Sequence, residues 1–136
     1  LVPLPRPVSL KNASIDIIRA FRPDAVLSRP VEETTKGTIA HLKAPPDSIA
    51  RALEPARPAC IVFPRWEAGA AIALAPLPKA RAFMQVADNS FNYQVLGARG
   101  FMALGRLVDA SDAYTFRYSS LVDAMALFER LALGAA

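Results

Sequence analysis

The chain has 136 residues, the size of one ordinary domain, with 53% hydrophobic residues, enough to bury one real core. Its 16 Lys and Arg against 12 Asp and Glu leave a net charge of +4 without a basic block, which disfavours nucleic-acid binding. One Cys and one His exclude a disulfide framework and a standard Cys/His zinc cluster, so we expect no metal site and a cytoplasmic setting. No apolar stretch is long enough to span a bilayer and the start lacks a signal-peptide pattern, so we expect no membrane association.

The first half of the chain predicts short elements. Prolines at positions 3, 5 and 7 favour an extended start. Asn12 is placed to cap a short amphipathic helix, and the alternation over 36–43 predicts a strand. After the prolines at 45 and 46, either Asp47 or Ser48 is expected to cap one helical turn.

The second half predicts strands followed by helices. The apolar run 59–63 is typical of a strand buried in the middle of a sheet, with 71–74 as its hairpin partner. From position 78 a period near 3.6 predicts two helices. The alternation over 114–118 predicts a short edge strand, and Ser120 begins a terminal helix that ends at Gly134.

This order of elements predicts an α/β or α+β fold in which helices cover one mixed sheet, with residues 1–136 as a single domain portion. It does not predict a complete nucleotide site. A phosphate-binding loop needs clustered glycines followed by Lys and Ser or Thr, and the six glycines of this chain are scattered.

Four segments carry a resemblance to a known family. They are Leu-Pro-Arg-Pro-Val-Ser-Leu-Lys-Asn at 4–12, Thr-Lys-Gly-Thr-Ile-Ala-His-Leu at 35–42, Ile-Val-Phe-Pro-Arg at 61–65 and Ala-Asp-Asn-Ser-Phe-Asn-Tyr at 87–93. Together they resemble the C-terminal half of the HPr-kinase-related proteins, in particular the kinase A group of proteobacterial exosortase and polysaccharide gene clusters. The resemblance covers roughly residues 4–132.

The resemblance implies part of a phosphoenolpyruvate-carboxykinase-like fold and an ATP-dependent protein kinase that uses ATP and Mg²⁺. The Walker A loop and the acidic segment of that family would precede residue 4. We therefore expect a fragment of a longer kinase that is inactive by itself, and a natural short protein remains the alternative. Its partners would be the missing N-terminal half or further copies of the chain, together with a protein substrate.

Four residues are candidates for contacting ATP phosphates. Arg65 directly follows the apolar run, where open sheets gather ligands, and its fork suits phosphate, although a structural ion pair would explain it equally well. Lys36 precedes a glycine that permits close backbone approach, and a solvated lysine is the alternative. Lys11 belongs to the Leu-Lys-Asn motif. His41 lies within the predicted strand, where a half-buried structural histidine is the alternative.

Other residues favour structural roles. Cys60 is expected to be a small buried hydrophobe, and Glu32 and Glu33 a solvated loop. Asn89 and Asn92 flank a helix junction, where capping explains them. A non-catalytic interaction or dimerisation module is the rival function for the whole chain.

Overall fold

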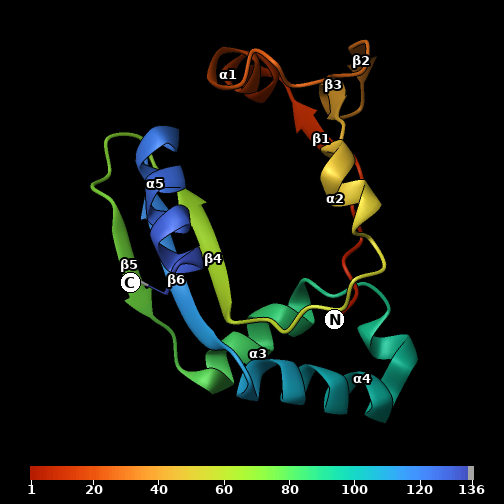
Figure 1. Cartoon of the computed structure of the whole chain (residues 1–136), viewed down its shortest axis with the longest axis vertical. Helices are drawn as coiled ribbons and strands as arrows, with labels where there is room; N and C mark the ends of the chain where they lie inside the picture. Colours follow the sequence, from red (N-terminus) through yellow and green to blue (C-terminus); the bar gives the residue numbers. More distant parts are fainter. Residues whose placement is uncertain (135–136) are drawn as a thin grey trace. The chain divides into compact units, whose positions relative to one another are not determined.

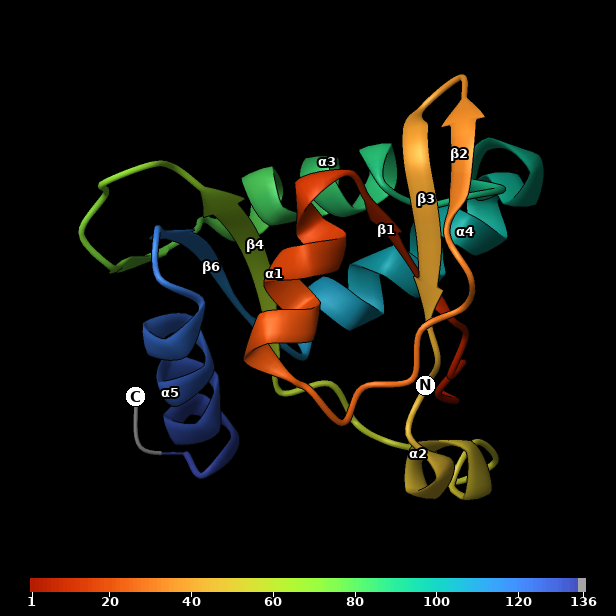
Figure 2. The ribbon, with the colours of Figure 1, turned by 90° about the horizontal axis from the view of Figure 1, so that it is seen from above.

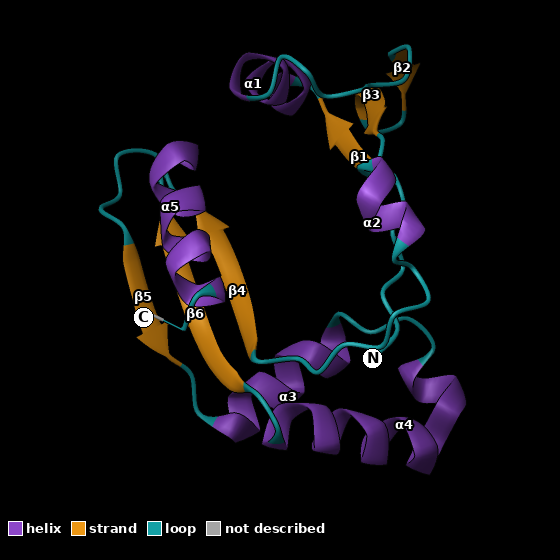
Figure 3. Ribbon diagram, in the orientation of Figure 1, coloured by secondary structure: helices purple, strands orange, loops and turns teal. Residues whose placement is uncertain are grey.

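The computed structural model describes residues 1–134, which contain six strands and five helices (Figure 1). The chain divides into two compact units, Leu1–Arg57 (unit 1) and Pro58–Ala136 (unit 2), and each contains a three-stranded sheet. The fold is therefore α+β, and the expectation of a single mixed sheet is wrong. Figure 3 colours the helices and strands of each unit.

Unit 1 is built on an antiparallel sheet in the order β1-β3-β2. Residue pairs Ser9 with His41 and Lys11 with Ile39 fix the register of β1 against β3. Figure 2 shows the three strands side by side, with α1 beside them. The elements are β1 (Val8–Lys11), α1 (Ala13–Phe21), β2 (Val31–Thr34), β3 (Gly37–Leu42) and α2 (Pro46–Ala50).

The core of unit 1 lies between α1 and one face of this sheet. Ile15 of α1 is buried against Leu10 and Ala40, which are register partners on that face. Because successive strand residues point to opposite faces, Ser9, Lys11 and His41 lie on the other face, and all of these side chains are exposed. The sheet of unit 1 thus has one packed face and one open face.

Asn12 stands at the N-cap position of α1 as predicted, but its side chain does not cap the helix. Its Oδ1 instead accepts a 3.0 Å hydrogen bond from the backbone N–H of Thr38, and its own N–H donates to the Thr38 carbonyl. These bonds close the gap between the end of β1 and the start of β3. The prediction of a capping side chain is therefore wrong, because Asn12 Oδ1 accepts from the backbone N–H of Thr38 in β3 and not from the first turn of α1.

Unit 2 contains the sheet β4-β6-β5, in which β4 runs parallel and β5 antiparallel to the central β6. Figures 1 and 3 show the three strands side by side with α5 against them. The elements are β4 (Cys60–Trp66), β5 (Ala73–Pro76), α3 (Lys79–Asp88), α4 (Tyr93–Asp109), β6 (Asp112–Tyr118) and α5 (Leu121–Ala132).

The structure of unit 2 corrects four expectations. Residues 60–63 of the apolar run belong to the edge strand β4 rather than to a central strand, and Cys60 is exposed rather than buried. The expected hairpin between 59–63 and 71–74 does not form, because β6 lies between β4 and β5. The segment 114–118 is part of the central strand, in which Ala113 and Phe116 are buried. Local pattern indicated a strand that overlaps each of β4, β5 and β6, but not the neighbours of these strands, which are set by packing between distant segments.

Helices pack on both faces of the unit 2 sheet. On one face, Ala82 of α3 and Val108 of α4 are buried against Ala113, with Ile61 and Phe63 of β4 beside them. On the other face, the Phe128 ring of α5 meets the Phe116 ring edge-on, with 5.4 Å between ring centroids. Aromatic pairs in this arrangement add to the energy of apolar burial.

The end of α4 is held by a lysine from the preceding helix. The Lys79 ammonium donates to the carbonyl oxygens of Val108, at 2.7 Å, and of Ser111. A cation at a helix C-terminus satisfies orphan carbonyls and interacts favourably with the helix dipole. The buried Ser111 hydroxyl donates to the Leu107 carbonyl at 2.8 Å. This clamp fixes the turn from which β6 begins.

Predictions at the helix and strand boundaries have mixed outcomes. The Ser120 hydroxyl accepts from the Asp123 N–H at 3.3 Å, which confirms the predicted cap of α5. Neither Asp47 nor Ser48 caps α2, which begins after Pro45 with no side-chain cap. Glu32 and Glu33 are exposed as expected but lie in β2 rather than in a loop.

We predict that Gly37→Ala destabilises unit 1 by about 2 kcal/mol or more. Gly37 has φ of +82°, and an added Cβ would lie 2.2 Å from Asn12 Oδ1. Urea denaturation followed by backbone circular dichroism measures the loss. Asn12→Gly in the same chain removes the obstructing side chain and should recover part of it. A Gly37→Ala variant as stable as the original chain would contradict the tight contact between these residues.

Candidate functional site

Two arginines lie side by side at one end of the unit 2 sheet. The parallel register of β4 and β6 makes Arg65 the direct partner of Arg117. Register partners on neighbouring strands point to the same face, and neighbouring strands are about 4.8 Å apart. Both side chains are exposed. The sequence predicted Arg65 as a candidate and missed Arg117, because the pairing of β4 with β6 cannot be read from local pattern.

The packing of the sheet leaves this arginine pair uncovered. Ile61 and Phe63 precede Arg65 on the same face, and there α3 and α4 pack on them. The face changes from packed to exposed along β4 as the strand approaches its carboxyl end. On the other side of Arg117, the register partner in β5 is Ala73, a small side chain. Ligands of open α/β sheets bind outside the carboxyl ends of parallel strands, which is where the two arginines lie.

Neither guanidinium is neutralised by a carboxylate among residues 1–134. The ion pairs recorded in the described chain join Arg19 to Asp16, Arg22 to Asp24 and Arg51 to Glu54, all in unit 1. Like charges directly opposite each other in a sheet are destabilising. The alternative of a structural ion pair for Arg65 is therefore not supported, and the pair presents an exposed double positive charge.

The Arg22 and Asp24 pair shows what a neutralised arginine looks like in this chain. Two hydrogen bonds of 3.0 Å join the guanidinium to both carboxylate oxygens. These bonds, together with the attraction between the charges, raise the pKa of Arg22 and lower the pKa of Asp24. Arg65 and Arg117 have no such partner within the described residues.

The other three candidates lie in unit 1. Lys11 and His41 share the open face of its sheet as diagonal neighbours, since Lys11 faces Ile39 and Ser9 faces His41. Such diagonal pairs are within reach of long side chains. Lys36 lies in the turn between β2 and β3, at the same end of the sheet as Lys11. All three side chains are exposed, so the alternative of a half-buried structural histidine is not supported.

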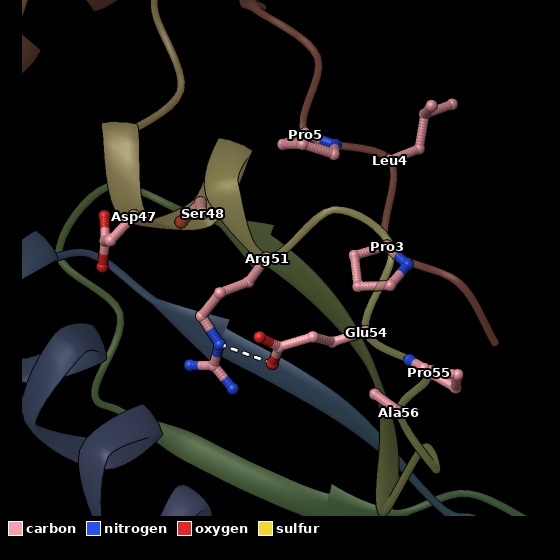
Figure 4. A pocket seen from close by; sticks show the side chains of 9 residues that line it. All are labelled: Pro3, Leu4, Pro5, Asp47, Ser48, Arg51, Glu54, Pro55 and Ala56. Carbon is pink, nitrogen blue, oxygen red and sulfur yellow. Dashed lines mark hydrogen bonds and ion pairs between the residues drawn. The ribbon is translucent and has the colours of Figure 1, made fainter.

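Four hollows in the described residues, two in each unit, are lined without Arg65, Lys36, Lys11 or His41. A hollow of about 350 Å³ in unit 1 lies between the start of the chain and α2. Figure 4 shows Arg51 turned toward Glu54 at one side of it, joined by a 2.7 Å hydrogen bond. In this ion pair the two side-chain charges neutralise each other. The hollow is lined by Pro3, Leu4, Pro5, Asp47, Ser48, Arg51, Glu54, Pro55 and Ala56.

Two features that commonly hold magnesium–ATP, a glycine-rich loop and a cluster of metal ligands, are not found in residues 1–134. Glycines with positive φ stand singly at 37, 69, 97 and 134, so consecutive amides do not converge as they do in a phosphate-binding loop. Within residues 1–134, no group of three or more His, Cys, Asp or Glu side chains is placed to hold a metal ion. The candidate phosphate contacts in this chain are therefore guanidinium and ammonium groups on strands and turns.

A scan against protein-family models and searches of curated proteins and solved structures find no match to this chain. In the part of the chain that the structure describes, no helix has the length and apolar character that crossing a membrane requires.

We predict that the chain alone does not bind Mg²⁺–ATP with submicromolar affinity, because exposed cations without a glycine nest or metal ligands give only weak attraction. Isothermal titration calorimetry with ATP and magnesium measures the affinity. A dissociation constant below 1 µM would show that residues of this chain complete a nucleotide site.

Proposed function

We propose that this chain is the C-terminal part of a cytoplasmic, ATP-dependent protein kinase similar to HPr serine kinase. The four sequence segments that resemble this family support the proposal. The structural observation that carries it is Arg65, an exposed arginine without a carboxylate partner in the described chain, at the carboxyl end of a parallel strand. A nucleotide half outside this sequence would supply the loop that holds ATP and magnesium.

In this proposal Arg65 acts by electrostatics. Phosphoryl transfer spreads negative charge over the oxygens of the transferred group, and enzymes accelerate it chiefly by positioning and charge stabilisation. The paired strand fixes the backbone of Arg65, so its guanidinium is kept within reach of that charge. The fork of an arginine also bonds two oxygens at once, which an ammonium cannot do. Lys36, Lys11 and His41 stay separate candidates for contacting phosphate on the exposed surface of unit 1.

A second candidate function is a non-catalytic interaction or dimerisation module. One feature of unit 2 favours it: large apolar side chains are exposed around the start of α4 and the loop before it. Phe91 is 96% exposed and Val95 is 84% exposed. Exposed apolar side chains that lie close together commonly mark a protein contact. In this function the chain would bind another protein or a second copy of itself.

We predict that Arg65→Ala in the full-length gene product lowers the rate of phosphoryl transfer from ATP to its protein substrate about 100-fold or more, because an electrostatic donor to the transition state is lost. Arg65→Lys should restore only part of the rate. The matched control is Arg130→Ala on α5, an exposed arginine that should change the rate little. The assay is transfer of labelled phosphate from ATP.

The melting temperature of each variant separates the two explanations of Arg65. Because Arg65 is exposed, we expect its variants to melt within a few degrees of the original protein. Near-normal transfer combined with a clearly lowered melting temperature would show that Arg65 has a structural role. A full-length product without any glycine-rich Lys-Ser or Lys-Thr loop would contradict the kinase and favour the interaction module.

We predict that the chain associates at high concentration through its exposed apolar residues. Light scattering coupled to size-exclusion chromatography measures the mass. Val95→Glu should shift the protein toward the monomer, because it places a charge among the apolar side chains. The control is Arg130→Glu, which changes charge away from them. A strictly monomeric original chain at high concentration would contradict association.

A further inference from the structure

We propose that Arg65 and Arg117 together form a binding site for one phosphoryl group, with Arg117 as a contact that the family resemblance does not supply. The inference rests on the proposed function, since it names what the carboxyl end of β4 binds. Unlike the proposed kinase activity, phosphate binding by the two arginines is a property of this chain alone. It can therefore be measured without the rest of the kinase.

The geometry begins with the register of the two strands. Arg65 and Arg117 are paired directly, in a ladder that continues through seven residue pairs from Cys60 with Asp112 to Trp66 with Tyr118. An uninterrupted ladder fixes both Cα atoms relative to each other. With strands about 4.8 Å apart, the two long side chains rise from neighbouring points on one face. One ligand can therefore contact both guanidiniums.

The surroundings keep the two charges free for a ligand. Ala73, the partner of Arg117 in β5, has a methyl group and no charge. Thr115, two residues before Arg117 on the same face, uses its hydroxyl to donate to the Ala75 carbonyl at 3.4 Å. Glu67, two residues after Arg65 and just beyond the end of β4, is the nearest acid to Arg65 along the chain. It forms no ion pair with either arginine within the described residues.

Contacts on the opposite face support the strand backbone beneath the two arginines. Phe116, adjacent to Arg117 in β6, is 1% exposed and stacks on Tyr118 with ring centroids 5.1 Å apart. Trp66, adjacent to Arg65, donates from its indole Nε1 to the Ser119 carbonyl at 3.1 Å. Each arginine is thus flanked by an aromatic residue anchored on the other side of the sheet. The backbone that positions the guanidiniums is held in place before any ligand arrives.

The chemistry of the pair selects a dianion with several oxygens. A carboxylate has two oxygens and is satisfied by one arginine fork. A phosphoryl group has three terminal oxygens and nearly two negative charges near neutral pH, so it can accept bonds from two forks and offset the repulsion between them. The expected ligand is a phosphate monoester or inorganic phosphate. In the cell the phosphoryl group would belong either to a nucleotide or to a phosphorylated protein side chain.

The test is an NMR titration of the chain with inorganic phosphate at constant ionic strength, following backbone amide signals. We expect a dissociation constant on the order of a few millimolar, with the largest shifts in β4 and β6 near the two arginines. Arg65→Gln and Arg117→Gln should each weaken binding about fivefold, because each removes one charged fork. Glu67→Gln should strengthen it, and Arg130→Gln on α5 should leave it unchanged.

Three outcomes of this titration would contradict a site shared by the two arginines. Loss of binding in only one arginine variant, equal loss in Arg130→Gln, or shifts confined to other surfaces would overturn the paired site. Parallel titrations with O-phosphoserine and with AMP distinguish the two sources, since the tighter ligand identifies the natural one. Because the titration uses no kinase activity, its failure leaves the phosphoryl-transfer measurement on Arg65 to decide the proposed function separately.

Both arginine variants are expected to fold, since their side chains are exposed and make no hydrogen bond to the rest of the described chain. Amide spectra of the variants without phosphate check this directly. Arg117→Lys serves as a second variant, because it keeps the charge and loses the fork. Full binding by Arg117→Lys would show that charge alone attracts the anion and would overturn the bidentate contact.

Discussion

The parallel pairing of β4 with β6 is the constraint on which the candidate site depends. It joins two segments that are about fifty residues apart and brings Arg65 beside Arg117. The connection between them contains β5, α3 and α4, and the helices return to pack on the face of the strands they connect. Lys79 completes the arrangement by holding the last carbonyls of α4 just before β6 begins. Without this clamp the start of β6, and with it the register, would be less well defined.

Unit 1 depends on a different contact. Asn12 adopts a positive φ of 50° and bonds to Thr38 with both its backbone and its side chain, beside a glycine that leaves room for it. A strained residue of this kind is kept when its surroundings hold it firmly. The contact ends β1 and orients α1 over Leu10 and Ala40. It leaves Lys11 and His41 on the opposite, open face, where they are accessible to a ligand of unit 1.

Local pattern predicted most elements but few of their partners. The apolar periodicity indicated α1, α3 and α5, and the alternation over 36–43 and 114–118 indicated β3 and β6. The partners of β4 and β5 were wrong because strand pairing is decided by packing between distant segments. Asn12 was assigned to a helix cap because a cap is its commonest local role, whereas a strand donor was available across the sheet. Arg65 was found from its place after an apolar run. Arg117 was missed because only the ladder brings it next to Arg65.

A phosphoryl group that contacts both Arg65 and Arg117 must change the surroundings of both guanidiniums at once. The most direct measurement is a phosphate titration that follows the NMR signals of the arginine side-chain Nε–H groups, assigned by substitution. We predict that the signals of Arg65 and Arg117 shift together with a single dissociation constant, while those of Arg99 and Arg130 on the helices move little. Shifts of the two signals with clearly different dissociation constants, or equal shifts in all exposed arginines, would contradict a shared site.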